Sequence, residues 1–181
     1  RLVRRGGVGS PELNSDGTSI FWSSTGRPNR YVSRLDLFRY DLKDKKRHRL
    51  SRGARLHGLT LHPDPDKRAG VAVQNDGPQN QLVWVELPEG DGEVAIRPIT
   101  AAADGSQYAD PAFDPSGERL AVSVWKPGGF RDIHVLDSKY QSLRTISWDR
   151  ASDIEPFWSR DGRWLLWSSD RDNCWNLYAY R

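Results

Sequence analysis

The hydrophobic residues of this chain fall in short runs that are separated by turns rich in Gly, Asp, Asn and Pro. Runs such as Ala69–Val73 and Gln81–Leu87 are rich in β-branched and aromatic residues, which is typical of strands. No segment keeps its apolar residues at the 3.6-residue period of an amphipathic helix. The pattern therefore predicts an all-β fold with almost no helix.

One phrase occurs three times along the chain. It reads DPAFDPSG at Asp110–Gly117, EPFWSRDG at Glu155–Gly162 and SPELNSDG at Ser10–Gly17, and each copy precedes an apolar strand-like segment. In every copy the Gly stands six residues after the Pro. We interpret the phrase as a short strand that begins at Pro and runs into a tight turn, which Gly closes because it tolerates a positive φ.

A degenerate copy, with Leu59 in place of Pro, lies between the copy at Ser10–Gly17 and the copy at Asp110–Gly117. The four anchor positions are spaced 48, 52 and 45 residues apart, and such a period is typical of propeller blades. Strands such as Trp164–Trp167 are apolar on both faces, as a sheet packed between two other sheets requires. The sequence thus predicts a β-propeller with four recognisable four-stranded blades. The predicted unit is a single propeller domain or propeller fragment over 1–181, with blades at about 8–51, 56–100, 108–147 and 153–181 and an outer strand at 1–7.

The repeated phrase resembles the TolB-like (WD-like) β-propeller repeat, whose blades open with Pro-x-aromatic-Ser-Pro-Asp-Gly. Asp110–Gly117 and Glu155–Gly162 match it closely, whereas Ser10–Gly17 carries Leu13 at the aromatic position. The resemblance covers nearly the whole chain and implies the fold, and it implies a periplasmic or cell-envelope setting in a bacterium. It does not choose between a binding domain and an enzyme's accessory domain, because the repeat serves both.

The blade count leaves three arrangements open. Complete propellers of that family usually have six or more blades, the last predicted blade lacks an outer strand, and Leu2–Arg4 reads as an outer strand without a blade. We favour a fragment of a larger ring. The alternatives are a four-bladed ring in which Leu2–Arg4 pairs with Trp175–Tyr180, and half of an eight-bladed ring that self-association with a second copy would complete.

Composition and charge bound the partners. No apolar run approaches the roughly 20 residues that span a bilayer, and the mean hydropathy is −0.74, so no direct membrane insertion is expected. The net charge of +3 hides an asymmetry: residues 1–55 carry 14 Lys and Arg against 5 Asp and Glu, and residues 56–181 carry 13 against 19. An uneven distribution favours an electrostatically steered partner.

Catalytic and cofactor motifs are missing from the sequence: it has no G-x-S-x-G, H-E-x-x-H or Walker phosphate loop. His57 and His62 stand five apart in a strand-like segment, which predicts opposite faces and no shared metal. Cys174 is interpreted as a small packed residue. The basic run Lys43–Arg49 is interpreted as a solvated turn rather than a nucleic-acid surface, because no stacking aromatics accompany it. We therefore predict a protein that is not an enzyme and uses no cofactor or metal.

Candidate contact residues gather where the innermost strand of each blade begins, near the mouth of the central channel. Acids there would bind a cation or a basic peptide, although Asp110 and Glu155 would equally accept backbone N–H bonds that hold the loops before the two prolines. The predicted partner-binding residues are Asp110, Glu155, Asp153, Tyr108, His57 and Arg55.

The function predicted from these features is a non-catalytic scaffold that binds a protein or peptide partner, because propeller loops converge on one end of a stiff framework. The first alternative is a substrate-gating propeller domain of a prolyl-oligopeptidase-type serine peptidase. A lyase or hydrolase acting within the channel would need a His-rich metal site, which the sequence does not offer.

Overall fold

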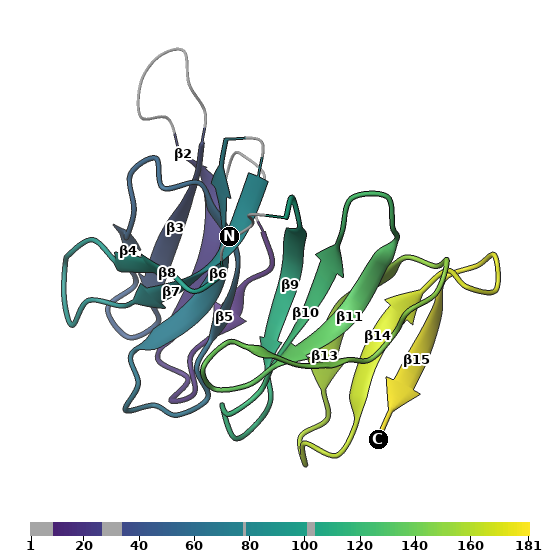
Figure 1. Ribbon diagram of the computed structural model, residues 1–181. Helices are drawn as coiled ribbons and strands as arrows, with labels where there is room; N and C mark the ends of the chain where they lie inside the picture. The colour runs from purple at the N-terminus through teal and green to yellow at the C-terminus, as the bar shows by residue number, and fades with distance from the viewer. Residues whose placement is uncertain (1–8, 27–33, 78, 101–103) are drawn as a thin grey trace.

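The computed structural model describes residues 9–26, 34–77, 79–100 and 104–181. Within these residues all regular structure is strand, so none of it is a helix that could cross a membrane. The strands form four antiparallel sheets, each made of consecutive strands (Figure 1). The prediction of an all-β fold with four blades is confirmed.

Each blade is ordered from its inner edge outward in chain order. The first two blades contain β1 (Glu12–Leu13), β2 (Ser19–Gly26), β3 (Arg34–Asp41) and β4 (Lys46–Arg49), then β5 (Leu56–Leu61), β6 (Ala69–Asp76), β7 (Gln79–Glu86) and β8 (Ala95–Pro98). The last two contain β9 (Gln107–Phe113), β10 (Leu120–Trp125), β11 (Arg131–Leu136) and β12 (Ser142–Thr145), then β13 (Asp153–Trp158), β14 (Leu165–Ser169) and β15 (Asn176–Tyr180).

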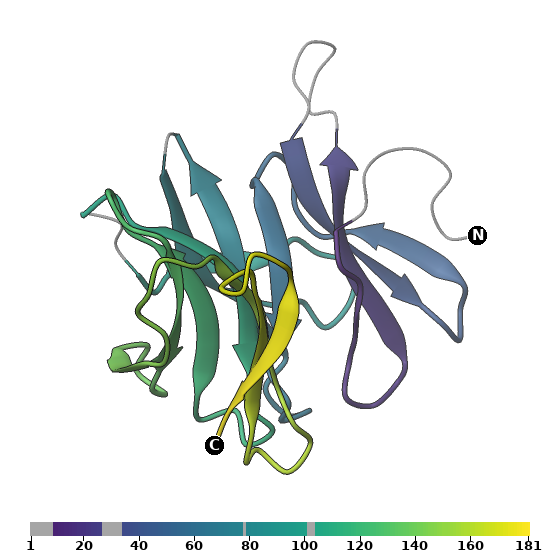
Figure 2. The same cartoon turned by 90° about the vertical axis from the view of Figure 1, so that its right-hand side faces the viewer.

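The blades are stacked around an axis by their first strands. β1 contacts β5, β5 contacts β9, and β9 contacts β13. Figure 1 shows the first and fourth blades at opposite ends of the stack, and in the turned view of Figure 2 the fourth blade faces the viewer. The fourth blade has three strands in the described chain. The outer strand predicted at Leu2–Arg4, and its pairing with β15, lie outside the described residues.

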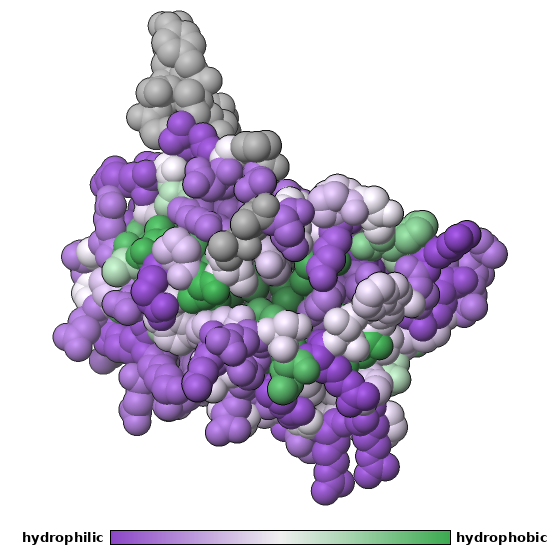
Figure 3. Space-filling view, viewed as in Figure 1, coloured by the Kyte–Doolittle hydropathy of each residue, from purple (hydrophilic) through white to green (hydrophobic). Residues whose placement is uncertain are grey.

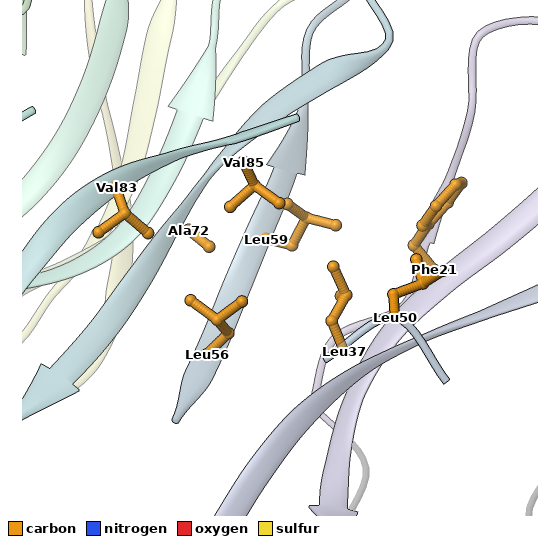
Figure 4. Packing of buried hydrophobic residues seen from close by; sticks show 8 residues of the cluster. All are labelled: Phe21, Leu37, Leu50, Leu56, Leu59, Ala72, Val83 and Val85. Carbon is orange, nitrogen blue, oxygen red and sulfur yellow. The ribbon is translucent and has the colours of Figure 1, made fainter. Parts of the chain in front are cut away.

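Three apolar clusters fill the spaces between successive blades. Figure 4 shows the first cluster, in which side chains of the first blade meet those of the second. Leu37 and Leu56 are completely buried there, and burying such a side chain contributes about 2 kcal/mol. The members of this cluster are Phe21, Leu37, Leu50, Leu56, Leu59, Ala72, Val83 and Val85. The apolar strands thus supply the contacts between blades. Trp164 departs from the prediction, because it lies before β14 and is exposed, whereas Leu165 and Trp167 are buried.

The repeated turn is formed as the sequence predicts. The N–H of Gly17, Gly117 and Gly162 each bonds the carbonyl of the residue three positions earlier, at 2.9 to 3.0 Å. All three glycines have φ between 67° and 74°, a left-handed conformation that is unfavourable for residues with a Cβ. Their surroundings differ, however, because a Cβ on Gly117 would lie 2.5 Å from the ring of His62, whereas one on Gly17 would meet nothing within 4 Å.

The basic run Lys43–Arg49 is only partly a solvated turn, which corrects the prediction. Its second half forms β4, where the Arg47 guanidinium lies 4.2 Å above the Phe38 ring. Arg49 reaches the buried carboxylate of Asp36 at 2.5 Å. Two of its cations therefore stabilise the first blade instead of facing a partner.

Candidate functional site

The three inner strands β5, β9 and β13 are each bulged at the same level. In β5 the pairing register shifts between His57 and Thr60. In β9 it shifts between Ala109 and Ala112, and in β13 between Ile154 and Phe157. The bulged residues are Gly58, Asp110 and Glu155, each followed by an anchor position, and their φ values are 57°, 51° and 54°. A left-handed conformation is costly for Asp and more so for Glu, which marks this level as a place to look for function.

Asp110 and Glu155 lie side by side at the inner edges of the third and fourth blades. The Asp110 carboxylate accepts the backbone N–H of Glu155 at 3.3 Å, as the backbone-holding interpretation predicts. The Glu155 side chain is exposed and has no bonding partner within the described chain. Of the two, Glu155 therefore has the freer carboxylate.

Asp153 lies between blades and is not presented to the channel. Its carboxylate is completely buried, and both of its oxygens accept hydrogen bonds from Arg171 Nη2, at 3.2 and 3.1 Å. Its carbonyl accepts the Ser123 hydroxyl of the third blade. In the register it stands at the level of Tyr108 and Leu56, which also face the preceding blade. Asp153 is outside the contact surface because its carboxylate is completely buried and paired with Arg171.

The remaining predicted residues are fixed by two asparagines of the second blade. The backbone N–H and carbonyl of Tyr108 bond the side chain of Asn80 at 2.6 and 2.8 Å. The ring of His57 lies 3.3 Å from the Asn75 side chain, and the Arg55 carbonyl accepts the Asn75 N–H at 3.1 Å. These residues thus share one end of the second and third blades, each partly buried.

The bulge also corrects the prediction that His57 and His62 point to opposite faces. His57 pairs with Val73, and the His62 N–H bonds the carbonyl of Ala69. Since Val73 and Ala69 are four apart on β6, the extra residue in the bulge returns both histidines to one face. His62 is buried against Trp84 and Phe113 and serves the contact between blades.

Two adjoining cavities open at the end of the blades where the inner strands β9 and β13 begin. This end is at the top in Figure 1, and we call it the upper end. One has a volume of about 420 Å³ and the other about 550 Å³, and Asp149 and Arg150 line both. Exposed aromatic side chains stand beside them: Trp148 is 88% exposed, Trp175 56% and Phe130 45%. In Figure 3 hydrophilic residues cover most of the visible face, and apolar patches show between them.

The sequence reasoning missed these aromatics. Trp148 and Trp175 stand in polar connections between strands, not within them, and that position was the available signal. Cys174, predicted to be packed, is exposed on the wall of the larger cavity. Aromatic rings left in water beside a cavity are typical of a binding surface, because their apolar area is otherwise unfavourably hydrated.

The charges that line the two cavities are balanced: they are the carboxylates of Asp132, Asp149 and Asp170 and the cations of Lys126, Arg150 and Arg171. Arg171 Nη2 lies 3.3 Å from Asp149 and 3.1 Å from Asp153, and its guanidinium stacks on Tyr178 at 4.3 Å. Burial, and secondarily the nearby charges of Asp153 and Asp149, raise the pKa of Asp132. Among the described residues, no three His, Cys, Asp or Glu side chains are placed to hold a metal ion.

A third cavity, of about 300 Å³, lies at the opposite end between the first two blades. Two of the three cations that line it are engaged: Arg39 pairs with Asp41 at 2.8 Å, and Arg68 donates to the Pro88 carbonyl at 2.7 Å. It therefore offers fewer free groups to a ligand than the upper end.

His134, on the wall of the smaller upper cavity, should make the stability of the fold depend on pH. Burial, and secondarily the charge of Lys126, lower the pKa of this histidine to about 4 from 6.5. The unfolded chain then takes up a proton first as the pH falls, so stability is greatest above pH 6.5 and decreases toward pH 4. We expect a loss of about 2 kcal/mol between pH 7 and pH 5, measured by urea unfolding.

The control for this prediction is His134→Asn, which removes the titrating ring. The difference between the two pH values should shrink by most of that amount in the variant. An unchanged difference would mean that another group, such as His62 with its own lowered pKa, carries the dependence.

No model of a known protein family matches the sequence. Solved structures, in contrast, resemble the chain over nearly its whole length. TolB from Acinetobacter baumannii superposes with a TM-score of 0.74 at 16% identity, over 98% of this chain and 42% of that one. An oligogalacturonate lyase in complex with manganese gives 0.70 at 18% identity, over 98% of this chain and 52% of the lyase. The β-propeller domain of the Trilobed protease from Pyrococcus furiosus gives 0.66 at 12%, over 97% and 54%.

These likenesses confirm the fold predicted from the repeat, a β-propeller of the kind found in TolB. The chain spans only about half the length of the proteins it resembles. Those proteins include both an enzyme and a peptidase's propeller domain, so the fold leaves the function open.

Proposed function

We propose that this chain is a non-catalytic propeller scaffold whose upper end binds a protein or peptide partner. The observation that carries the proposal is the group of exposed aromatics, Phe130, Trp148 and Trp175, beside two adjoining cavities. Large aromatic side chains are enriched among the residues that dominate protein interfaces. The inner strands hold the loops on a rigid frame, which lowers the entropy lost on binding.

The channel mouth is proposed as the continuation of this surface. Glu155 offers an exposed carboxylate at the inner edge of the fourth blade, and His57, Arg55 and Tyr108 lie at the inner edges of its neighbours. A partner that contacts the upper end and reaches toward the axis would meet these residues next. Asp110 contributes mainly by holding Glu155 through its backbone.

We further propose that the four blades belong to a larger envelope-associated assembly. The similarity to TolB structures supports a periplasmic setting, and the chain's short span relative to those structures supports a larger ring, formed with further blades or by self-association. The proposed partner is a protein or peptide, with no nucleic acid and no direct insertion into a membrane.

Site-specific photo-crosslinking tests the proposal. A benzoylphenylalanine in place of Trp148, or of His57 at the channel mouth, should give a discrete adduct with a partner protein in extracts of the source cells. The same residue in place of Trp164 should give none, because Trp164 is also exposed but lies in the turn before β14, at the opposite end. Mass spectrometry would identify the adduct.

Adducts formed only at position 164, or none at any position, would contradict the proposal. Competition with unlabelled protein separates specific adducts from collisional ones. A partner seen at position 148 but not at 57 would restrict the surface to the third and fourth blades.

A second candidate is the substrate-gating propeller domain of a prolyl-oligopeptidase-type peptidase. The similarity to the propeller of the Pyrococcus furiosus protease favours it. The two candidates differ in the coding sequence, since a peptidase domain encoded in the same reading frame would decide for gating.

A further inference from the structure

The third and fourth strands of the blades repeat one polar arrangement, and this repetition allows the blades to be compared position by position. In the first three blades the backbone N–H of a buried residue on the third strand bonds a hydroxyl that follows the fourth strand. The bonds are Leu37 to Ser51 at 3.0 Å, Leu82 to Thr100 at 2.9 Å and Ile133 to Ser147 at 2.9 Å. The residues that precede these donors therefore occupy equivalent positions in the first three blades: they are Asp36, Gln81 and Asp132. Asn176 stands at the same register in the fourth blade.

In the first blade the acid at this position is fully paired. Asp36 is completely buried, and its carboxylate accepts the Arg49 guanidinium at 2.5 Å, the Ser51 hydroxyl at 3.2 Å and the Gly53 N–H at 2.6 Å. Arg49 also donates to the Ser51 carbonyl at 3.0 Å. Hydrogen bonds between ions of this kind are about twice as strong as neutral ones. This blade shows what the arrangement needs: a guanidinium on the fourth strand.

The second blade has neither ion at these positions, and the fourth, which has three strands in the described chain, has no acid. The second carries Gln81, with Pro98 at the register of Arg49, and the fourth carries Asn176. A neutral side chain needs no cation, so the arrangement remains balanced in both blades.

The third blade keeps the acid but has no arginine at the register of Arg49. Asp132 is equivalent to Asp36, whereas Thr145 stands at the register of Arg49, opposite His134. One carboxylate oxygen of Asp132 is buried and has no partner among the described residues. A buried carboxylate oxygen without a partner destabilises the fold, because the loss of its hydration is not compensated. Lys126 and Arg150, which line the same space, form no ion pair with it within the described chain.

The space that the arginine fills in the first blade is the smaller upper cavity in the third. Its volume is about 420 Å³, and its walls include Asp132, His134 and Thr145, together with the exposed rings of Trp148 and Phe130. We infer that this cavity binds the guanidinium of an arginine side chain presented by a partner peptide. The inference rests on the proposed function and deepens it, because it names the partner's contacting group.

The walls suit a guanidinium in two further ways. The flat cation stacks favourably on an indole ring, and Trp148 stands at the rim with most of its surface free. The Ser147 carbonyl is equivalent to the Ser51 carbonyl, which accepts a hydrogen bond from Arg49. The third blade therefore has both acceptors that bind the Arg49 guanidinium in the first blade, a carboxylate and a carbonyl. A planar group with several fixed donors can satisfy both, and an ammonium can satisfy them less well.

The test compares the capped tripeptide Ac-Gly-Arg-Gly-NH₂ with its citrulline counterpart, a neutral isostere. Binding is followed by NMR through the indole N–H of Trp148, assigned by its loss in Trp148→Phe. We expect saturable shifts with the arginine peptide and at least tenfold weaker binding of the citrulline peptide. Asp132→Asn should weaken binding of the arginine peptide by a similar factor.

Two variants keep the result interpretable. Thr145→Arg places an arginine of the chain itself beside Asp132, as Arg49 lies beside Asp36 in the first blade. It should weaken binding of the arginine peptide at least tenfold and raise the midpoint of thermal unfolding. Glu118→Gln removes an exposed carboxylate in the turn between β9 and β10, at the opposite end, and should leave binding unchanged. If Asp132→Asn fails to fold, Thr145→Arg decides.

Equal binding of the two peptides, or undiminished binding by Asp132→Asn or Thr145→Arg, would overturn the inference. These failures differ from failure of the proposed function. A crosslinked partner that Asp132→Asn retains equally would preserve the scaffold and remove the arginine pocket. Arginine-specific binding without any crosslinked partner would preserve the pocket and remove the scaffold role.

Discussion

Replacing Asp36 by Asn is expected to lower the free energy of unfolding by about 3 kcal/mol or more. The carboxylate is completely buried and is bound by Arg49, Ser51 and the Gly53 N–H. An amide in its place presents an NH₂ group either to the Arg49 guanidinium or to the Gly53 N–H, so donors face donors and a cation loses its partner. Urea unfolding at pH 7 measures the loss.

The matched control is Asp132→Asn, which makes the same change at the equivalent position of the third blade. Because Asp132 forms no ion pair among the described residues and one of its carboxylate oxygens lacks a partner there, its replacement should cost less than about 1 kcal/mol. A similar loss at both positions would mean that the two acids are equally well paired in solution. That result would also undermine the arginine pocket inferred above.

Replacing Gly117 by Ala is expected to destabilise the protein by about 3 kcal/mol or more, through two causes that add. The residue has φ of 74°, and a side chain in that conformation costs on the order of 1 kcal/mol. A Cβ would also lie 2.5 Å from the ring of His62. That ring is buried between Trp84 and Phe113, so it can move only by disturbing the contact between the second and third blades, which costs about 1 to 3 kcal/mol.

Two glycines in the same turn separate these causes. Gly17→Ala meets nothing within 4 Å and should show only the backbone cost of about 1 kcal/mol. Gly162→Ala places its Cβ at ordinary contact distance, 3.5 Å from Pro115, and should lie close to Gly17→Ala. Thermal unfolding of the three variants ranks them. Equal losses would show that His62 yields easily and that conformation alone sets the cost.

Much of the fold could be predicted because its signals are local. The Pro anchor and the Gly six residues later mark the start of the first, third and fourth blades. The structure forms the turn in all three and places a bulge beside the Pro in the third and fourth. The alternation of apolar strands and polar turns then predicts the blades. Both signals depend on residues that are close in sequence, so one copy of the repeat suffices to interpret them.

The candidate site was only partly predictable. Asp110 and Glu155 were expected at the inner edge, and the structure brings them together there. Asp153 was expected beside them but faces the preceding blade, because the bulge changes which side of the strand each residue occupies. The same bulge returned His57 and His62 to one face. One inserted residue reverses the alternation, and a sequence pattern with period two does not reveal it.

The sequence by itself determined the architecture of this protein: its repeated strands, its turns and the four blades they form. Only the tertiary structure decided which polar groups are free. Asp36 and Asp132 have similar neighbours along the chain, yet one is paired and the other faces a cavity, because the deciding residue lies on the adjacent strand. Likewise, Trp148 was recognisable as a contact residue only once its exposure beside that cavity was known. Pairing and exposure are set by residues distant in sequence, and these two properties define the binding surface.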